Sequence, residues 1–260
     1  MPRRGEPDIA GLYHLHSSNV RERPIDLVLD HDRAPRRFRT YAGSQRVALP
    51  GRDFRIDAPL GGLLERRRSI REFELRDLEP ELLGRLLHAS AGVRGYRSLD
   101  GDWTIDRCAP SAGGLYPTEL YVVTQRVAGV ADGVYHYDAR AHELELRNPG
   151  THHAALAGMT IEQDMIRSAN VVVAITAVFE RTMWKYGQRG YRYVWLDAGH
   201  LAENLYLVAL ALGLGPVAIG GFFDSEIDGL LRLPGDERAV YLVCVGWPAD
   251  PGAEPERMGL

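Results

Sequence analysis

The pattern of apolar and polar positions predicts strands through the middle and the end of the chain. Asn170 to Val178 is almost wholly apolar, which is typical of a strand buried on both faces. Two shorter apolar stretches flank residues 138–142 and predict a hairpin formed by residues 134–137 and 143–147. Further apolar runs predict strands over residues 119–125, 217–223 and 239–246.

The same pattern predicts three helices. Glu79 to Ala91 has the spacing of an amphipathic helix, with the leucines at positions 82, 83, 86 and 87 on one face. Residues 193–212 are apolar nearly all round, which indicates a long internal helix. A short helix is expected over residues 225–231.

The first part of the chain is expected to be irregular. Pro24, Pro35 and Pro50 interrupt every candidate element there. With 260 residues, 45% of them hydrophobic, the chain can bury one substantial core. We therefore expect an N-terminal extension over residues 1–55 and an α+β domain over residues 56–260, built around a sheet and one central helix.

Charge and composition exclude several classes of protein. The formal net charge of −4 and the pI near 6.1 indicate no basic surface for nucleic acid or an anionic membrane. The most apolar run, residues 205–215, is too short to span a bilayer, and no signal peptide is recognisable, so we expect a cytoplasmic protein. Cys108 and Cys244 form no CxxC pattern, which favours free thiols over a disulfide. His152-His153 has no partners at metal-ligand spacing, so no metal site is expected.

Arginines crowd a segment before the first predicted helix. Arg66-Arg67-Arg68-Ser69-Ile70-Arg71 could hold a phosphate, because guanidinium groups match its oxygens and the serine hydroxyl adds a hydrogen bond. The neighbouring Glu65, Glu72 and Glu74 leave a second interpretation open, a solvated run of mixed charge.

Two glycine-containing loops add to the case for a bound cofactor. Pro110-Ser111-Ala112-Gly113-Gly114-Leu115-Tyr116-Pro117 has adjacent glycines between prolines, so its backbone can pass close to a flat or bulky group. Ile219-Gly220-Gly221-Phe222-Phe223-Asp224 is a second such loop, and with the arginine segment the two predict a flavin site. Residues 213–218 also match a GxGxxA fingerprint, but they follow a helix and precede a strand, the reverse of a Rossmann turn. We expect their glycines to end the helix.

Aromatic and basic residues alternate between positions 184 and 195. The adjacent Lys185 and Tyr186 suit general acid–base chemistry, because an ammonium group lowers the pKa of a phenol and burial lowers the pKa of a lysine. The alternative is an aromatic cluster that packs a connecting loop on the core. A polar stripe follows on the predicted long helix, and it could orient a ligand or form a seam at a subunit interface. The stripe consists of Asp197, His200, Glu203 and Asn204.

With these segments the chain resembles the FMN-dependent nitroreductase fold family, from about Glu65 to Trp247. Within it, the chain is most similar to the SagB-type dehydrogenases of thiazole/oxazole-modified microcin biosynthesis. The KYGQRGYRY stretch with Asp197-Ala198-Gly199-His200 carries that similarity, because ordinary nitroreductases lack the Lys–Tyr signature. Leu12-Tyr13-His14-Leu15-His16 is similar to a short motif near the start of those dehydrogenases. The resemblance implies a nitroreductase-like α+β fold: a mostly antiparallel sheet flanked by helices, a long central helix and a C2 homodimer.

The resemblance also implies roles for individual residues. Arg67 and Ser69 would contact the FMN phosphate and ribityl chain, with Arg71 at the N1/O2 edge and Gly220-Gly221 near N5. The 110–114 loop would come from the partner subunit, and its alanine and second glycine replace a serine and an asparagine that are usual in ordinary nitroreductases. The implied FMN-binding residues are Arg67, Arg68, Ser69, Arg71, Pro110, Ser111, Ala112, Gly114, Gly220, Gly221 and Arg257.

The implied activity is the oxidation of a thiazoline or oxazoline ring in a peptide to the aromatic azole. Lys185 or Tyr186 would be the base that removes the α-proton, and the flavin would accept the hydride. A peptide substrate and a cyclodehydratase complex are the implied partners. Two alternatives stay open: an NAD(P)H-dependent nitro or quinone reductase of the same fold, and a flavin-free protein that docks a peptide onto a modifying complex.

Overall fold

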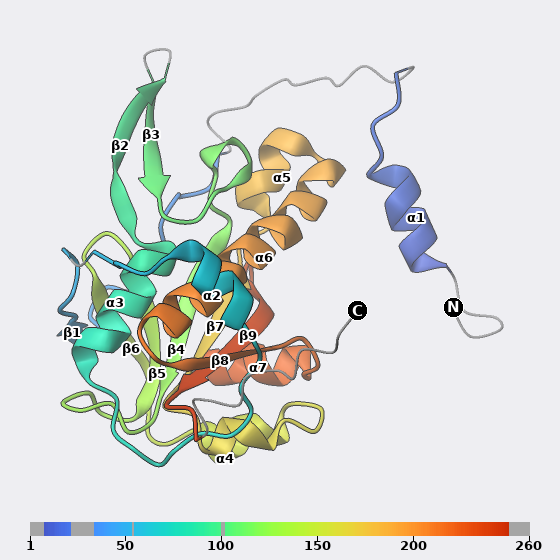
Figure 1. Ribbon diagram of the computed structural model, residues 1–260. Helices are drawn as coiled ribbons and strands as arrows, with labels where there is room; N and C mark the ends of the chain where they lie inside the picture. Colours follow the sequence, from blue (N-terminus) through green and yellow to red (C-terminus); the bar gives the residue numbers. More distant parts are fainter. Residues whose placement is uncertain (1–7, 22–33, 54, 100–101, 250–260) are drawn as a thin grey trace, which may run out of the picture.

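A seven-stranded antiparallel sheet forms the centre of the computed structural model, which describes residues 8–21, 34–53, 55–99 and 102–249 (Figure 1). In spatial order, its strands are β1 (Arg46–Ala48), β6 (Glu143–Pro149), β5 (Gly133–Asp138), β4 (Thr118–Thr124), β7 (Val171–Ala177), β9 (Arg238–Gly246) and β8 (Gly215–Ile219). The expected hairpin is β5 with β6, and the α+β class with a mostly antiparallel sheet is confirmed.

Strand β7 lies between β4 and β9, and every residue of β4 and β7 is buried. Because side chains alternate along a strand, β7 contributes to two cores. Val173 and Ile175 belong to the core under α6, whereas Val172 and Ala174 belong to the core on the opposite face. This confirms the prediction of a strand buried on both faces.

Helices cover both faces of the sheet (Figure 1). On one face lie α3 (Pro80–Ala91) and the long α6 (Gln188–Ala211), with α2 (Leu60–Arg66) and α5 (Glu180–Tyr186) packed against α6. On the other face lie α4 (His153–Gly158), the turn η3 (Asp164–Arg167) and α7 (Asp224–Leu231). A separate hairpin of β2 (Val93–Leu99) and β3 (Asp102–Arg107), which the sequence pattern did not predict, projects away from the sheet (Figure 1).

Helix α6 differs from the expected internal helix. It begins at Gln188, five residues earlier than expected, and Gly213 with φ +76° follows its end as predicted. Its side chains are not all covered, since Trp195 and Leu196 are exposed. The sheet covers only one side of α6. The apolar sequence of this helix predicted burial but could not show what would cover its other side.

The N-terminal part of the chain is more regular than expected. Helix α1 (Ile9–His16) contains the Leu12–His16 motif, and its first turn is capped by Asp8, whose side chain accepts a hydrogen bond from the backbone N–H of Gly11. Strand β1 joins the sheet at its β6 edge. The prediction of an irregular segment was wrong for these two elements because no proline falls inside them: Pro35 lies between them and Pro50 follows β1. The domain division at residue 55 stays a prediction.

Two smaller predictions can be compared directly with the structure. Cys108 and Cys244 are free thiols, as favoured above. The strand expected over residues 217–223 ends at Ile219, because the following glycines leave the ladder with β9. No helix in the described part of the chain combines the length and apolarity needed to cross a bilayer.

Candidate active site

The loop at residues 110–117 forms one half of the candidate site. Residues Ala112–Gly114 make a single 3₁₀ turn (η2), closed by the Gly114 N–H, which donates to the Ser111 carbonyl at 3.0 Å. Gly113 and Gly114 have φ values of +63° and +64°, a left-handed conformation that side chains with a Cβ rarely adopt. The loop therefore needs glycine for its backbone shape.

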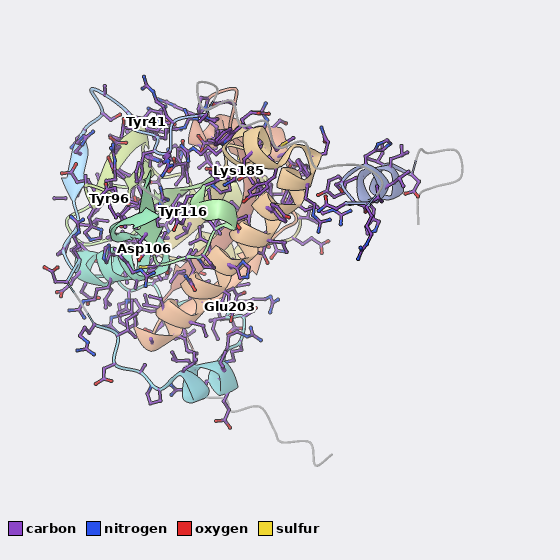
Figure 2. The ribbon with its side chains drawn as sticks, turned by 90° about the horizontal axis from the view of Figure 1, so that it is seen from above. Tyr41, Tyr96, Asp106, Tyr116, Lys185 and Glu203 are labelled. Carbon is purple, nitrogen blue, oxygen red and sulfur yellow. The ribbon has the colours of Figure 1, made fainter. Side chains whose placement is uncertain are left out.

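Lys185 and Tyr186 lie directly on this loop. A Cβ placed on Gly113 would be 2.5 Å from the Tyr186 hydroxyl and 3.4 Å from Lys185 Nζ, so a larger residue could not keep both side chains in place. In Figure 2, seen from above, Lys185 lies near Tyr116 of this loop. The structure thus brings together two segments that are more than 70 residues apart in the sequence and that were both singled out from it.

Close contact between α5 and α6 fixes this pair. A Cβ on Gly190 would lie 2.9 Å from Met183 Cα, so the two helices meet almost backbone to backbone. The Tyr186 ring packs edge-on against Tyr193, with 5.1 Å between ring centroids, and Phe179 stacks on Tyr191. The alternating aromatics therefore belong to two packed helices, and the idea of a connecting loop was wrong.

The electrostatics of Tyr186 differ from the expectation. Burial raises the pKa of the Tyr186 phenol, and the nearby Tyr193 and Asp197 raise it further. The expected lowering by Lys185 is therefore wrong: the Lys185 Nζ lies 5.4 Å from the centroid of the ring, and burial and two acidic neighbours dominate. The phenol is protonated at neutral pH.

Asp197 connects the loop to α6. The Ser111 hydroxyl donates to Asp197 Oδ2 at 2.5 Å, and the Ala112 N–H donates to Oδ1 at 3.2 Å. Of the predicted polar stripe, Asn204 also points inward and donates to the carbonyls of Ser90 and Cys108. His200 and Glu203 are exposed instead, with Glu203 further along the helix in Figure 2.

The arginine segment forms a second group, next to β8. The Ser69 hydroxyl is 3.0 Å from the Tyr206 hydroxyl, which accepts from the Ala218 N–H at 2.7 Å. The Arg67 guanidinium carbon lies 5.8 Å from the centroid of the Tyr206 ring, and the Ile70 N–H donates to the Pro216 carbonyl. Tyr206 was missed from the sequence, where it looks like one more apolar helix position.

The ends of this second group are open to solvent. Arg67, Arg71 and Gly220 are exposed, and Gly220-Gly221 directly follow β8. Guanidinium groups beside a serine hydroxyl are a suitable donor set for a phosphate. Arg257, the last implied phosphate contact, lies outside the described residues.

The loop with Lys185 and Tyr186 (the loop group) and the arginine segment with Tyr206 (the arginine group) do not meet within one chain. Both groups contact α6, the loop group through Asp197 and the arginine group through Tyr206. These positions are nine residues apart, about two and a half helical turns, so they lie on opposite sides of the helix axis.

A buried charge cluster supports the loop from beneath, and the sequence analysis missed it. Arg181 forms a 2.7 Å ion pair with Glu119, and its guanidinium also donates to the Tyr116 carbonyl at 3.3 Å. His136 lies between Glu119 and Glu145. Burial opposes the charge on Glu119, but Arg181 and His136 outweigh it and lower the pKa of that carboxyl to about 2. Burial likewise opposes the charge on His136, whose pKa its two carboxylate partners raise to about 9.

Comparison with known proteins identifies the family to which this chain belongs. The model of the nitroreductase family matches residues 64–247. The chain belongs to the nitroreductase family. The match includes every described candidate residue at both groups, and it makes the protein a member of an oxidoreductase family.

Individual relatives agree with this assignment. MJ1384 of Methanocaldococcus jannaschii, named as a nitroreductase, is 40% identical over 72% of this chain and 90% of its own length. The microcin B17-processing protein McbC of Escherichia coli is 28% identical, over 56% of this chain and 55% of its own length. A crystal structure of a nitroreductase from Anabaena variabilis has a TM-score of 0.78 and 28% identity, covering 97% of this chain and 49% of that one. The resemblance to the nitroreductase fold family is thus confirmed, with a microcin-processing protein among the homologues.

Proposed function

We propose that this chain is an FMN-dependent dehydrogenase that oxidises thiazoline or oxazoline rings in a peptide to thiazole or oxazole. The observation that carries the proposal is the contact of Lys185 and Tyr186 with the Gly113 backbone, because it puts an acid–base pair on a loop suited to a flat ligand. Similarity to a microcin-processing protein supports it. The direct test is incubation of purified protein with a synthetic azoline peptide, in which the loss of two hydrogens per ring is measured by mass.

The residues of the arginine group fit an FMN phosphate. Arg67 and Ser69 would hold it, Arg68 and Arg71 would add positive charge, and the backbone of the exposed Gly220 and the half-buried Gly221 would face the ring system. FMN, when bound, supplies an acceptor for the hydride that leaves the azoline ring. The residues of this chain bind and orient the reactants.

In this proposal, Lys185 and Tyr186, which lie on α5 beside the loop, carry out proton removal. The raised pKa of Tyr186 keeps its phenol protonated, so this residue serves as a hydrogen-bond donor to the ring that is oxidised. We assign Lys185 as the base that takes the α-proton of the azoline. The contact with Gly113 limits how far either group can move.

Replacing Arg67 with alanine is expected to weaken FMN binding by about 10- to 100-fold. A charge-assisted hydrogen bond contributes about 1.5–3 kcal/mol, and the shortened side chain cannot make it. Titration of apoprotein with FMN, followed by flavin fluorescence, measures the change. Arg66→Ala is the matched control, because its side chain donates back to the Gly62 carbonyl along α2. Equal affinity of the Arg67 and Arg66 variants would place Arg67 in a solvated charge run.

A homodimer with shared sites is also expected. Each site would combine the arginine group of one chain with the loop, Lys185 and Tyr186 of the other, because these groups lie on opposite sides of α6. Trp195 and Leu196, exposed on that helix, would be covered by the partner.

Mixing two impaired variants tests this arrangement, at an FMN concentration that loads wild-type sites but not Arg67→Ala sites. Arg67→Ala and Lys185→Ala chains, unfolded and refolded together, should recover about a quarter of the wild-type activity, because half of the dimers are mixed and each has one intact site. A mixture that stays as inactive as its components, or a monomer that holds FMN in sedimentation, would contradict shared sites.

A reductase of the same fold is the second candidate, favoured by the 40% identity to MJ1384. That activity would need NAD(P)H as hydride donor and would not need the Lys185–Tyr186 pair. Rapid NAD(P)H oxidation with a nitroaromatic or quinone, in a protein that leaves azoline peptides unchanged, would favour it. We further propose that the protein acts in the cytoplasm with a cyclodehydratase partner that forms the azoline.

A further inference from the structure

Asp197 is a buried carboxylate whose hydrogen bonds, among the described residues, all run to one loop. The residue is 6% exposed, and its carboxylate accepts hydrogen bonds from the Ser111 hydroxyl and the Ala112 N–H. Ser111 Oγ in turn accepts from the Tyr116 N–H at 2.8 Å. The carboxylate therefore holds the start of the turn that contains Gly113 and Gly114, and Ser111 links it to Tyr116 beyond the end of that turn.

The same helix that carries Asp197 also sets the position of Lys185 and Tyr186. Helix α5 is packed on α6 at Gly190, two turns before Asp197, and Tyr186 contacts Tyr193 between these points. One stretch of α6 thus holds both the loop and the acid–base pair in position. Without Asp197 the loop would lose its hydrogen bonds to that helix, while α5 would keep its own contacts.

We propose that Asp197 is a positioning residue, which holds the 111–114 loop at the distance from Lys185 and Tyr186 that proton transfer requires. This rests on the function proposed above. Asp197 acts through the loop: its two oxygens are occupied by Ser111 and Ala112, so they are not directed at the reacting ring. The loop residues next in sequence, Gly113 and Gly114, carry no side chain that could hold the turn in place by packing.

Substitutions at position 197 can separate the effect of the hydrogen bonds from the effect of the negative charge. Burial raises the pKa of Asp197, and the bonds from Ser111 and Ala112 oppose that change. An asparagine has the same size and keeps one oxygen that can accept from the Ala112 N–H. An alanine keeps neither oxygen. A positioning role therefore predicts substantial rescue by asparagine, whereas a role as proton acceptor predicts none.

The experiment compares Asp197→Ala and Asp197→Asn with Glu203→Ala and Glu203→Gln, matched changes at an exposed position of the same helix. In the FMN-loaded dimer with an azoline peptide, we expect kcat of Asp197→Ala to fall by about 10- to 100-fold, as for a small misplacement of reacting groups. We expect Asp197→Asn to stay within about 10-fold of wild type, and the KM for the peptide to be unchanged in both when FMN is saturating. Hydrogen exchange at the Ala112 amide should speed up in Asp197→Ala only.

The results that would overturn the positioning role differ from the result that would overturn the proposed function. Asp197→Asn as slow as Asp197→Ala would show that the charge matters and would overturn the positioning role. So would an Asp197→Ala enzyme with the kcat of Glu203→Ala, or one whose Ala112 amide stays protected. A wild-type protein that oxidises no azoline peptide would overturn the proposed function itself, and the positioning role with it.

Discussion

Replacing Lys185 with alanine, or Tyr186 with phenylalanine, is expected to lower azoline oxidation by about 10²–10⁴, the usual contribution of a positioned acid–base group. The ends of both side chains lie beside the position that a Cβ on Gly113 would take, but neither residue belongs to the arginine group that we assign to FMN. FMN content and dimerisation should therefore be retained. Single-turnover oxidation of an azoline peptide, with the flavin quantified on the same sample, measures both quantities.

Tyr193→Phe is the matched control for Tyr186→Phe. It removes a hydroxyl from the ring that packs edge-on against Tyr186 and leaves the packing intact. We expect this variant to keep near wild-type turnover. If the Lys185 and Tyr186 variants lose flavin in proportion to activity, the two residues pack the aromatic cluster and are not catalytic. Wild-type turnover in both variants would instead favour the reductase alternative.

Local pattern was enough to predict most of the sheet and both longer helices on it. Strand β7 and the hairpin of β5 and β6 follow from apolar runs and turn residues, which act over a few positions. Strand β1 could not be predicted in this way. It has three residues, and what makes it a strand is pairing with β6 almost 100 residues later.

The candidate site was predicted as separate segments and not as a constellation. Lys185, Tyr186 and the 110–117 loop each stand out by composition, but only the fold shows that they touch. Asp197 was placed in a polar stripe whose partners the sequence could not give, because the bond to Ser111 joins residues 86 positions apart. The pKa of Tyr186 was predicted in the wrong direction, since an adjacent lysine is visible in a sequence and burial is not.

Charged residues inside apolar strands were the signal that the sequence analysis did not use. Glu119 begins the run that forms β4, and His136 lies in the middle of β5. Lone charges in such runs are costly unless they are paired after folding. In the structure Glu119 pairs with both Arg181 and His136, and Arg181 links this cluster to the loop of the candidate site through its bond to the Tyr116 carbonyl.

Replacing Arg181 with methionine is expected to reduce the free energy of unfolding by about 3–5 kcal/mol, because it removes the arginine partner of the buried Glu119 and leaves His136 as its ion-pair partner. The variant also loses the bonds from Arg181 to the Arg36 and Tyr116 carbonyls. Urea unfolding followed by circular dichroism measures the change. Arg167→Met is the matched control, since its ion pair with Asp164 is exposed and contributes about 0–1 kcal/mol. Equal midpoints for the two variants would show that the Glu119–Arg181 pair does not stabilise the fold.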